Sequence, residues 1–192
     1  MSHRNDDANI CQMAIRGEAT VADLYRTAGK AELVHGDLVV MSPGGGTHGR
    51  AALAIVASLR EYERRTRRGY AIPDNVGFLV RLQGRRSFSP DAAFHPGPID
   101  EKFIEGAPVF AVEVRSPEDV GPGAERMMAA KRADYFAAGT LVVWDVDVTR
   151  EGWVRVYRAS DPENPTVHRR GDIADAEPAL PGWVFPVDDL FA

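Results

Sequence analysis

The segment PVFAVEVRS, which begins at Pro108, constrains the fold more than any other stretch of the chain, because its residues alternate as in a β-strand. In an extended strand, successive side chains point to opposite faces of the sheet. Glu113 and Arg115 would therefore share the face opposite to Phe110, Val112 and Val114. Two interpretations account for these charges: an ion pair on a solvated sheet face, which contributes little stability, or half of a functional site.

Helical and strand patterns alternate along the rest of the chain, without an internal repeat. Helices are expected at 21–29, where Thr20 is the cap, at 47–69, with Gly69 as the C-terminal stop, and at 124–139. A β-hairpin is expected at 32–43, and further strands at 75–82, 87–94, 141–147 and 152–159. This mixture predicts an α/β fold in which helices flank a mixed sheet.

Length and composition limit the organisation and the partners. With 192 residues, 44% of them hydrophobic, we expect a single domain over residues 19–192, preceded by a flexible leader, residues 1–18. A single cysteine, Cys11, excludes an intramolecular disulfide. No apolar run reaches the roughly 20 residues that span a bilayer, so we expect a cytoplasmic protein that binds no membrane. Because the net charge is −5, binding to DNA would require a local basic patch.

Asp91 is the carboxylate that best complements Glu113. It follows Pro90 within or at the end of the expected strand 87–94, where it would arrive from a neighbouring strand. Two carboxylates and a backbone carbonyl suffice for Mg²⁺ (or Mn²⁺), which prefers oxygen ligands and keeps several waters. A nearby cation would stabilise the charge that develops on a phosphate. The alternative for Asp91 is a turn residue after proline.

These motifs resemble a known family. Ser-Pro-Asp at 89–91 and Glu-Val-Arg at 113–115 are similar to the PD-(D/E)XK nuclease superfamily. More closely, the order of ELVHGDLVVMSP, His48, SPDAAF, FAVEVRSP, Lys131, Tyr135 and GTLVVWDVD resembles the Uma-type family of restriction-endonuclease-like proteins. The resemblance covers roughly residues 24–147, together with the PGW…F ending of the tail, and implies a restriction-endonuclease-like core.

Carried over to this chain, the resemblance implies that Asp91 and Glu113 are metal ligands, with the carbonyl of Val114 as a third. Arg115 stands where the superfamily usually has lysine. Arginine stays charged in proteins, so it can orient a phosphate but cannot act as a base. Lys131 matches the helical position where Uma-type members often carry a lysine, so the resemblance makes it the catalytic cation, assisted by Arg115.

The resemblance also places two further residues near the site. Glu32 would ligate the metal or hold a water, and His48 would contact phosphate or relay protons. The alternatives are a surface lysine on an amphipathic helix for Lys131 and a simple helix-start residue for His48.

The first hypothesis is therefore a metal-dependent endonuclease that hydrolyses DNA phosphodiester bonds. Arg81, Arg85 and Arg86, with the basic helix end at 63–69, are expected to contact the DNA backbone, unless they form only a solvated face. A rival hypothesis is a nuclease-fold module that binds or dimerises without cutting, because Arg115 replaces the expected lysine. Hydrolysis of another phosphate ester is a third. The resemblance also implies a homodimer.

Overall fold

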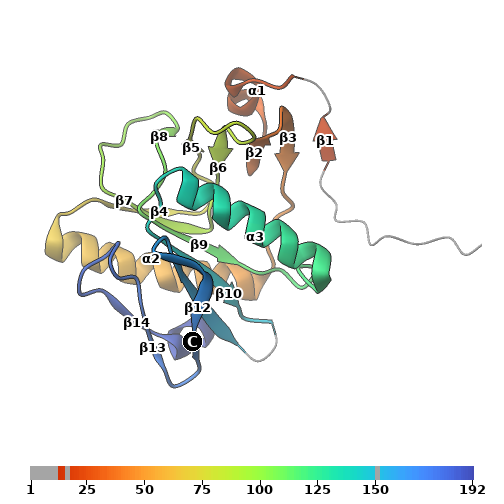
Figure 1. The fold of residues 1–192 in the computed structure, drawn as a ribbon. Coiled ribbons are helices and arrows are strands. Elements are labelled where there is room, and N and C mark those ends of the chain that lie inside the picture. Colours follow the sequence, from red (N-terminus) through yellow and green to blue (C-terminus); the bar gives the residue numbers. More distant parts are fainter. Residues whose placement is uncertain (1–12, 16–17, 150–151) are drawn as a thin grey trace, which may run out of the picture.

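A six-stranded mixed sheet forms the centre of the protein (Figure 1). The computed structural model describes residues 13–15, 18–149 and 152–192. The strand order is β12-β11-β10-β9-β7-β4. In chain order these strands are β4 (Tyr70–Pro73), β7 (Ala92–His95), β9 (Phe110–Val114), β10 (Val142–Asp147), β11 (Trp153–Arg158) and β12 (Asp161–Arg169). β9 and β10 pair in parallel, and the other neighbours are antiparallel.

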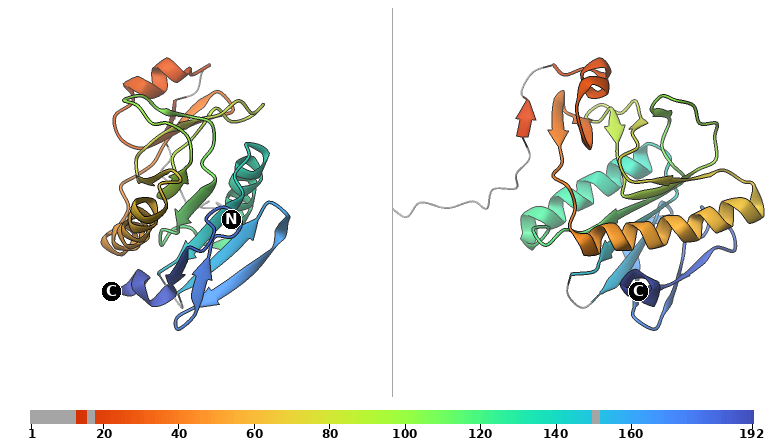
Figure 2. Two further views of the ribbon diagram at one scale, coloured as in Figure 1. Left: turned by 90° about the vertical axis from the view of Figure 1, so that its left-hand side faces the viewer. Right: turned by 180° about the vertical axis from the view of Figure 1, so that it is seen from behind.

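The two long helices cover opposite faces of this sheet (Figure 2, left). On one face, α2 (Gly46–Thr66) buries an apolar stripe against the side chains of Phe110 and Val112. On the other face, Tyr135 of α3 (Gly121–Ala137) packs in a cluster with Ala111. The alternation predicted for β9 is confirmed, and Glu113 falls on the face covered by α3. The predicted α/β fold is likewise confirmed.

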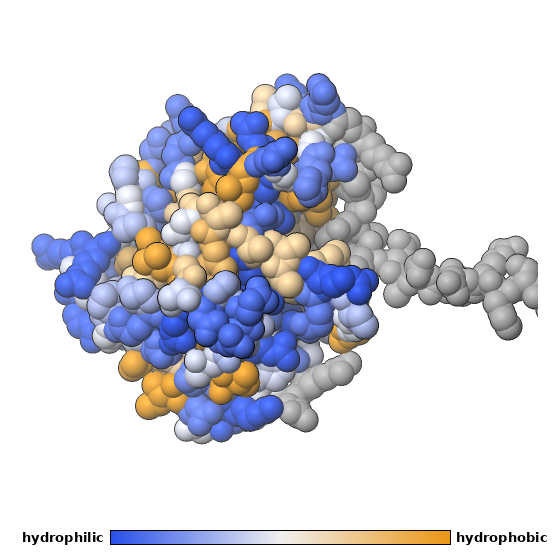
Figure 3. All heavy atoms as spheres, in the orientation of Figure 1, coloured by the Kyte–Doolittle hydropathy of each residue, from blue (hydrophilic) through white to orange (hydrophobic). Residues whose placement is uncertain are grey.

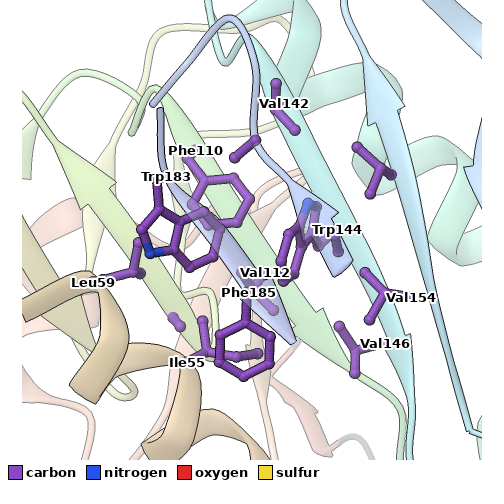
Figure 4. Close-up of a cluster of buried hydrophobic side chains, with 14 of the residues drawn as sticks. Ile55, Leu59, Phe110, Val112, Val142, Trp144, Val146, Val154, Trp183 and Phe185 are labelled. Atoms are coloured by element: carbon purple, nitrogen blue, oxygen red, sulfur yellow. The ribbon is translucent and has the colours of Figure 1, made fainter. Parts of the chain in front are cut away.

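The C-terminal segment completes the core on the α2 side. It comprises β13 (Ile173–Asp175), β14 (Val184–Pro186) and the short helix η1 (Val187–Phe191). Trp183 packs beside Trp144 of β10, with 5.1 Å between their ring centroids (Figure 4). Both tryptophans are buried. Trp153 is only half-buried and lies instead under the guanidinium of Arg155, 4.0 Å from its ring centroid.

A smaller sheet, in the order β1-β3-β2, lies beside the central layer. It contains β1 (Met13–Ile15), β2 (Ala31–Val34) and β3 (Asp37–Val40), and α1 (Val21–Arg26) follows β1 in the chain. The predicted hairpin turns at His35 and Gly36, both with positive φ, as a two-residue type I′ turn requires. β1 falls within the expected leader and pairs with β3. Residues 1–12, which include Cys11, and residues 16–17 of the expected leader lie outside the described residues.

Several element boundaries differ from the sequence-based expectations. The expected strand 87–94 is two strands, β6 (Ser87–Phe88) and β7, and β6 joins β5 (Phe78–Leu79) and β8 (Ile104–Glu105) in a third sheet. Pro90 and Asp91 lie between β6 and β7. The helix α2 ends at Arg67, in the left-handed conformation, two residues before the predicted Gly69.

Two strands of the central sheet, β4 and β12, were not predicted from the sequence, and neither were β1, β8, β13 and β14 outside that sheet. β12 contains Pro162 and Pro165, which remove backbone donors; such a strand is tolerated here because it lies at the sheet edge. Weakly apolar side chains form a band along the outer face of α3 (Figure 3). None of the helices in the described part of the chain is both long and apolar enough to cross a membrane.

Candidate active site

Two buried carboxylates meet where β7 and β9 begin to separate. The antiparallel register places Ala92 opposite Val112, so the next position on each strand is Asp91 and Glu113. The amide of Asp91 donates to the carbonyl of Val112 at 3.0 Å, which fixes Asp91 against β9. The two side chains are only 5% and 11% exposed. The tertiary fold therefore brings together the two carboxylates that the sequence predicted as a pair.

Asp91 accepts hydrogen bonds from three parts of the chain. Its Oδ2 accepts from the amide of Val114 at 2.7 Å and lies 3.3 Å from Nε2 of His48, in the first turn of α2. Its Oδ1 accepts from Nζ of Lys30, which precedes β2. A strand, a helix N-terminus and the hairpin sheet thus converge on one carboxylate, and His48 lies at the site as predicted.

Glu113 is held by two side chains of α3. Tyr135 donates from its hydroxyl to Oε1 at 2.7 Å, and Lys131 donates from Nζ to Oε2 at 2.8 Å. These residues are four apart, so they lie on the same face of the helix. Nζ of Lys131 also lies 2.9 Å from Oε1 of Glu32 on β2. Lys131 is therefore a buried bridge between two carboxylates, and the alternative of a surface lysine is wrong.

The charges of this cluster shift its pKa values in opposite directions. Burial raises the pKa of Glu113; Lys131 and Lys30 lower it and the carboxylates Asp91 and Glu32 raise it, and the net shift is upward. Burial also disfavours charge on Asp91, but the hydrogen bond from His48 and the charge of Lys30 hold the pKa of Asp91 well below its usual range. The hydrogen bond with Asp91 in turn raises the pKa of His48. The pKa of Asp91 is thus lowered while that of its neighbour Glu113 is raised.

Lys30 is the residue that the sequence analysis missed. It stands two positions before Glu32, so strand alternation would have placed both on one side of β2. Tyr135 appeared among the family motifs, but its hydrogen bond to Glu113 became visible only in the fold.

Arg115 does not point into this site, contrary to the prediction that it assists Lys131. Its guanidinium makes a two-pronged ion pair with Asp145 of β10, with N–O distances of 2.7 and 2.8 Å. A third nitrogen donates to Glu125 of α3 at 2.5 Å. Arg115 does lie on the same face as Glu113, but it forms its ion pair with the buried Asp145 on the neighbouring strand.

Arg85 is also not a DNA contact, contrary to the prediction. It is 7% exposed and donates to Glu32 at 2.5 Å and to Asp134 of α3 at 2.7 Å. Arg85 therefore holds the carboxylates of Glu32 and Asp134 in place. Arg81 and Arg86, at the same turn, are exposed.

The donor chemistry of the pair fits a hard divalent cation. Asp91 and Glu113 supply carboxylate oxygens from adjacent strands, and a magnesium-type site needs only one or two such ligands because water supplies the rest. Among the described residues, no group of three or more His, Cys, Asp or Glu is arranged to hold a metal ion. Glu32 reaches the pair through Lys131, and its carboxylate is already occupied by Lys131, Arg85 and the amide of Ser89.

The site is thus a cluster of acids and lysines at the end of the central strands, on a mixed α/β core. A family model described as "Putative restriction endonuclease", Uma2, matches residues 19–188. The chain belongs to this family.

A solved structure has the same fold. The crystal structure of a protein from Anabaena variabilis, described as a "putative nuclease belonging to DUF820", superposes with a TM-score of 0.71. The two chains are 18% identical, and the match covers 90% of this chain and 97% of the other. No curated protein sequence matches the chain.

Proposed function

We propose that this protein is a metal-dependent endonuclease that hydrolyses phosphodiester bonds in DNA at the Asp91–Glu113 pair. The observation that carries the proposal is the pairing of two buried carboxylates from adjacent strands with two lysines whose side chains are only 16% and 14% exposed. Such a set can hold a cation and a phosphate together. The family of the chain, described as a "putative restriction endonuclease", supports a nuclease function.

In this proposal Asp91 and Glu113 hold Mg²⁺ or Mn²⁺, with the carbonyl of Val114 and Glu32 as further candidate ligands. A bound divalent cation would supply Lewis-acid stabilisation of phosphate charge and a more acidic water. The raised pKa of Glu113 supports such a role, because a cation beside it would relieve the repulsion from Asp91 and Glu32.

The side chains around the pair would orient Glu113 and offset charge on the phosphate. Tyr135 fixes Oε1 of Glu113, and the pKa of its hydroxyl is raised by burial and by Glu113, so it stays a donor. Lys131 places a permanent positive charge beside Glu113, where it would offset charge developing on the phosphate. His48 can share a proton with Asp91 across 3.3 Å and lies where it could pass that proton to substrate.

Cleavage of supercoiled plasmid DNA tests this function. Asp91→Asn and Glu113→Gln are each expected to lower the rate at least about 100-fold, because metal stabilisation of a transition state is worth several kcal/mol. Asp189→Asn, at an exposed position, is the matched control. Cleavage that is equal in all three variants would contradict the proposal, as would no cleavage by the parent protein with any divalent metal. Parallel assays on single-stranded DNA and RNA define the substrate.

One observation favours the second candidate, a module that binds without cutting. The three buried carboxylates are already balanced by the positive charges of Lys30, Lys131 and Arg85, as they would be in a site that holds no metal. Calorimetric titration with Mn²⁺ separates the two candidates, since the module would bind none. The homodimer implied by the resemblance stays a prediction that sedimentation can check.

A further inference from the structure

Lys30 occupies the carboxylate that the proposed metal needs. Its side chain is 16% exposed, and Nζ contacts Oδ1 of Asp91. The same ammonium group lies 2.7 Å from Oδ1 of Asp74, in the loop that follows β4. Lys30 therefore bridges two carboxylates, of which Asp91 is buried and Asp74 is 45% exposed.

Lys131 also bridges two carboxylates, but its surroundings differ. Its second partner, Glu32, is 5% exposed and is also held by Arg85 and by the amide of Ser89. Moving Lys131 toward Glu32 would leave Glu113 without its cation in a buried site, which is costly. Asp74, by contrast, is at the surface, and solvent can relax around a lysine that moves toward it.

We propose that Lys30 is an internal counter-cation of Asp91 that a divalent metal ion must displace, and that Asp74 receives its ammonium group when this happens. The inference rests on the proposed function, because it concerns metal binding at the same pair. Lys30 is thus a positioning residue that sets the affinity of the site for metal.

Charge balance gives the physical reason. An ammonium group cannot coordinate a metal ion, and a divalent cation beside it on Asp91 would meet strong repulsion. With Lys30 on Asp91, the three buried carboxylates are neutralised, so a divalent ion would bring two uncompensated charges. Once Lys30 pairs with Asp74 alone, Asp91 regains a free oxygen and the site regains one negative charge.

The chain offers a well-matched set of variants, because it contains only three lysines: Lys30, Lys102 and Lys131. Lys30→Met removes the competing charge and keeps much of the apolar stem, and Lys102→Met is the control at an exposed position. Asp74→Asn removes the receiving charge at a position where loss of folding is not expected. Circular dichroism verifies that each variant is folded.

Isothermal titration with Mn²⁺ measures affinity without any need for cleavage. We expect Lys30→Met to bind Mn²⁺ about tenfold more tightly than the parent, which corresponds to about 1.4 kcal/mol. Asp74→Asn is expected to bind several-fold more weakly, and Lys102→Met equally well. A merely structural role for Lys30 would weaken binding in Lys30→Met, so the two variants would move in the same direction.

The outcomes separate this inference from the proposed function. If the parent binds Mn²⁺ and Asp91→Asn abolishes binding, but Lys30→Met binds no more tightly, the inference is overturned and the metal site stands. If Lys30→Met binds while the parent does not, the inference holds and the metal-dependent activity of the parent is contradicted. Binding by neither protein overturns both.

Discussion

Replacing Arg115 with methionine separates a structural role for this residue from the catalytic one that its place in the sequence predicts. The guanidinium neutralises Asp145, which has no exposed surface, and also contacts Glu125. Arg115 thereby ties β9 and β10 to α3. Methionine keeps most of the apolar stem, so the substitution removes mainly the charge and its hydrogen bonds.

Removing one partner of a buried ion pair costs about 3–5 kcal/mol, because the other charge stays buried and unpaired. Nη1 of Arg132 lies 3.7 Å from Oδ2 of Asp145 and can compensate in part. We therefore expect Arg115→Met to lower the free energy of unfolding by about 3 kcal/mol, a large share of the roughly 5–15 kcal/mol typical of a domain. The double variant Arg115→Met, Asp145→Leu is expected to recover about 2 kcal/mol, since it leaves no unpaired carboxylate.

Urea denaturation followed by circular dichroism measures these values. Arg126→Met, at an exposed position of α3, is the matched control and should change stability by no more than about 0.5 kcal/mol. Plasmid cleavage per folded molecule should survive in Arg115→Met. Native stability combined with loss of cleavage would refute the reasoning and restore Arg115 to the active site.

Two further predictions concern the imidazole and the DNA surface. The pKa of His48 is raised in the folded protein, so its ion pair with Asp91 contributes stability below pH 6.5, and this contribution is lost as pH rises through the raised pKa. Without divalent metal, His48→Asn should therefore flatten the decline in unfolding free energy between pH 6 and 8.5, whereas His35→Asn should leave it; an unchanged slope in His48→Asn would exclude the ion pair. The double variant Arg81→Glu, Arg86→Glu is expected to weaken DNA binding and to reduce the salt slope of the logarithm of affinity by about 0.9 for each lost phosphate contact. Fluorescence anisotropy on labelled duplex at several salt concentrations measures this, and an unchanged slope would place the DNA elsewhere.

Much of the fold could be predicted because its elements have strong local patterns. The apolar stripe of α2, the alternation of β9 and the glycine turn after His35 each reflect a short-range rule. β12 was missed because its prolines contradict strand propensity, and only its edge position makes them acceptable. The break between β6 and β7 was missed because alternation continues across Pro90.

The candidate site shows the same division between local and long-range information. The pair of Asp91 and Glu113 followed from alternation and motif order, and the position of Lys131 followed from the resemblance. The partners of the arginines did not follow, because an arginine reaches any acid that the fold brings near. Arg115 pairs with Asp145, thirty residues later in the chain, and Arg85 pairs with Glu32, fifty-three residues earlier.

By itself, the sequence determined the helices, most strands of the central sheet and which carboxylates face the same side of it, since these depend on periods of two and about 3.6 residues. Only the tertiary structure decided how the charges are paired. It gave Lys131 to Glu113, Lys30 to Asp91 and Arg115 to Asp145. The reason is physical: a buried charge must find a partner, and the partner is set by which strands and helices pack together, not by neighbours in the chain.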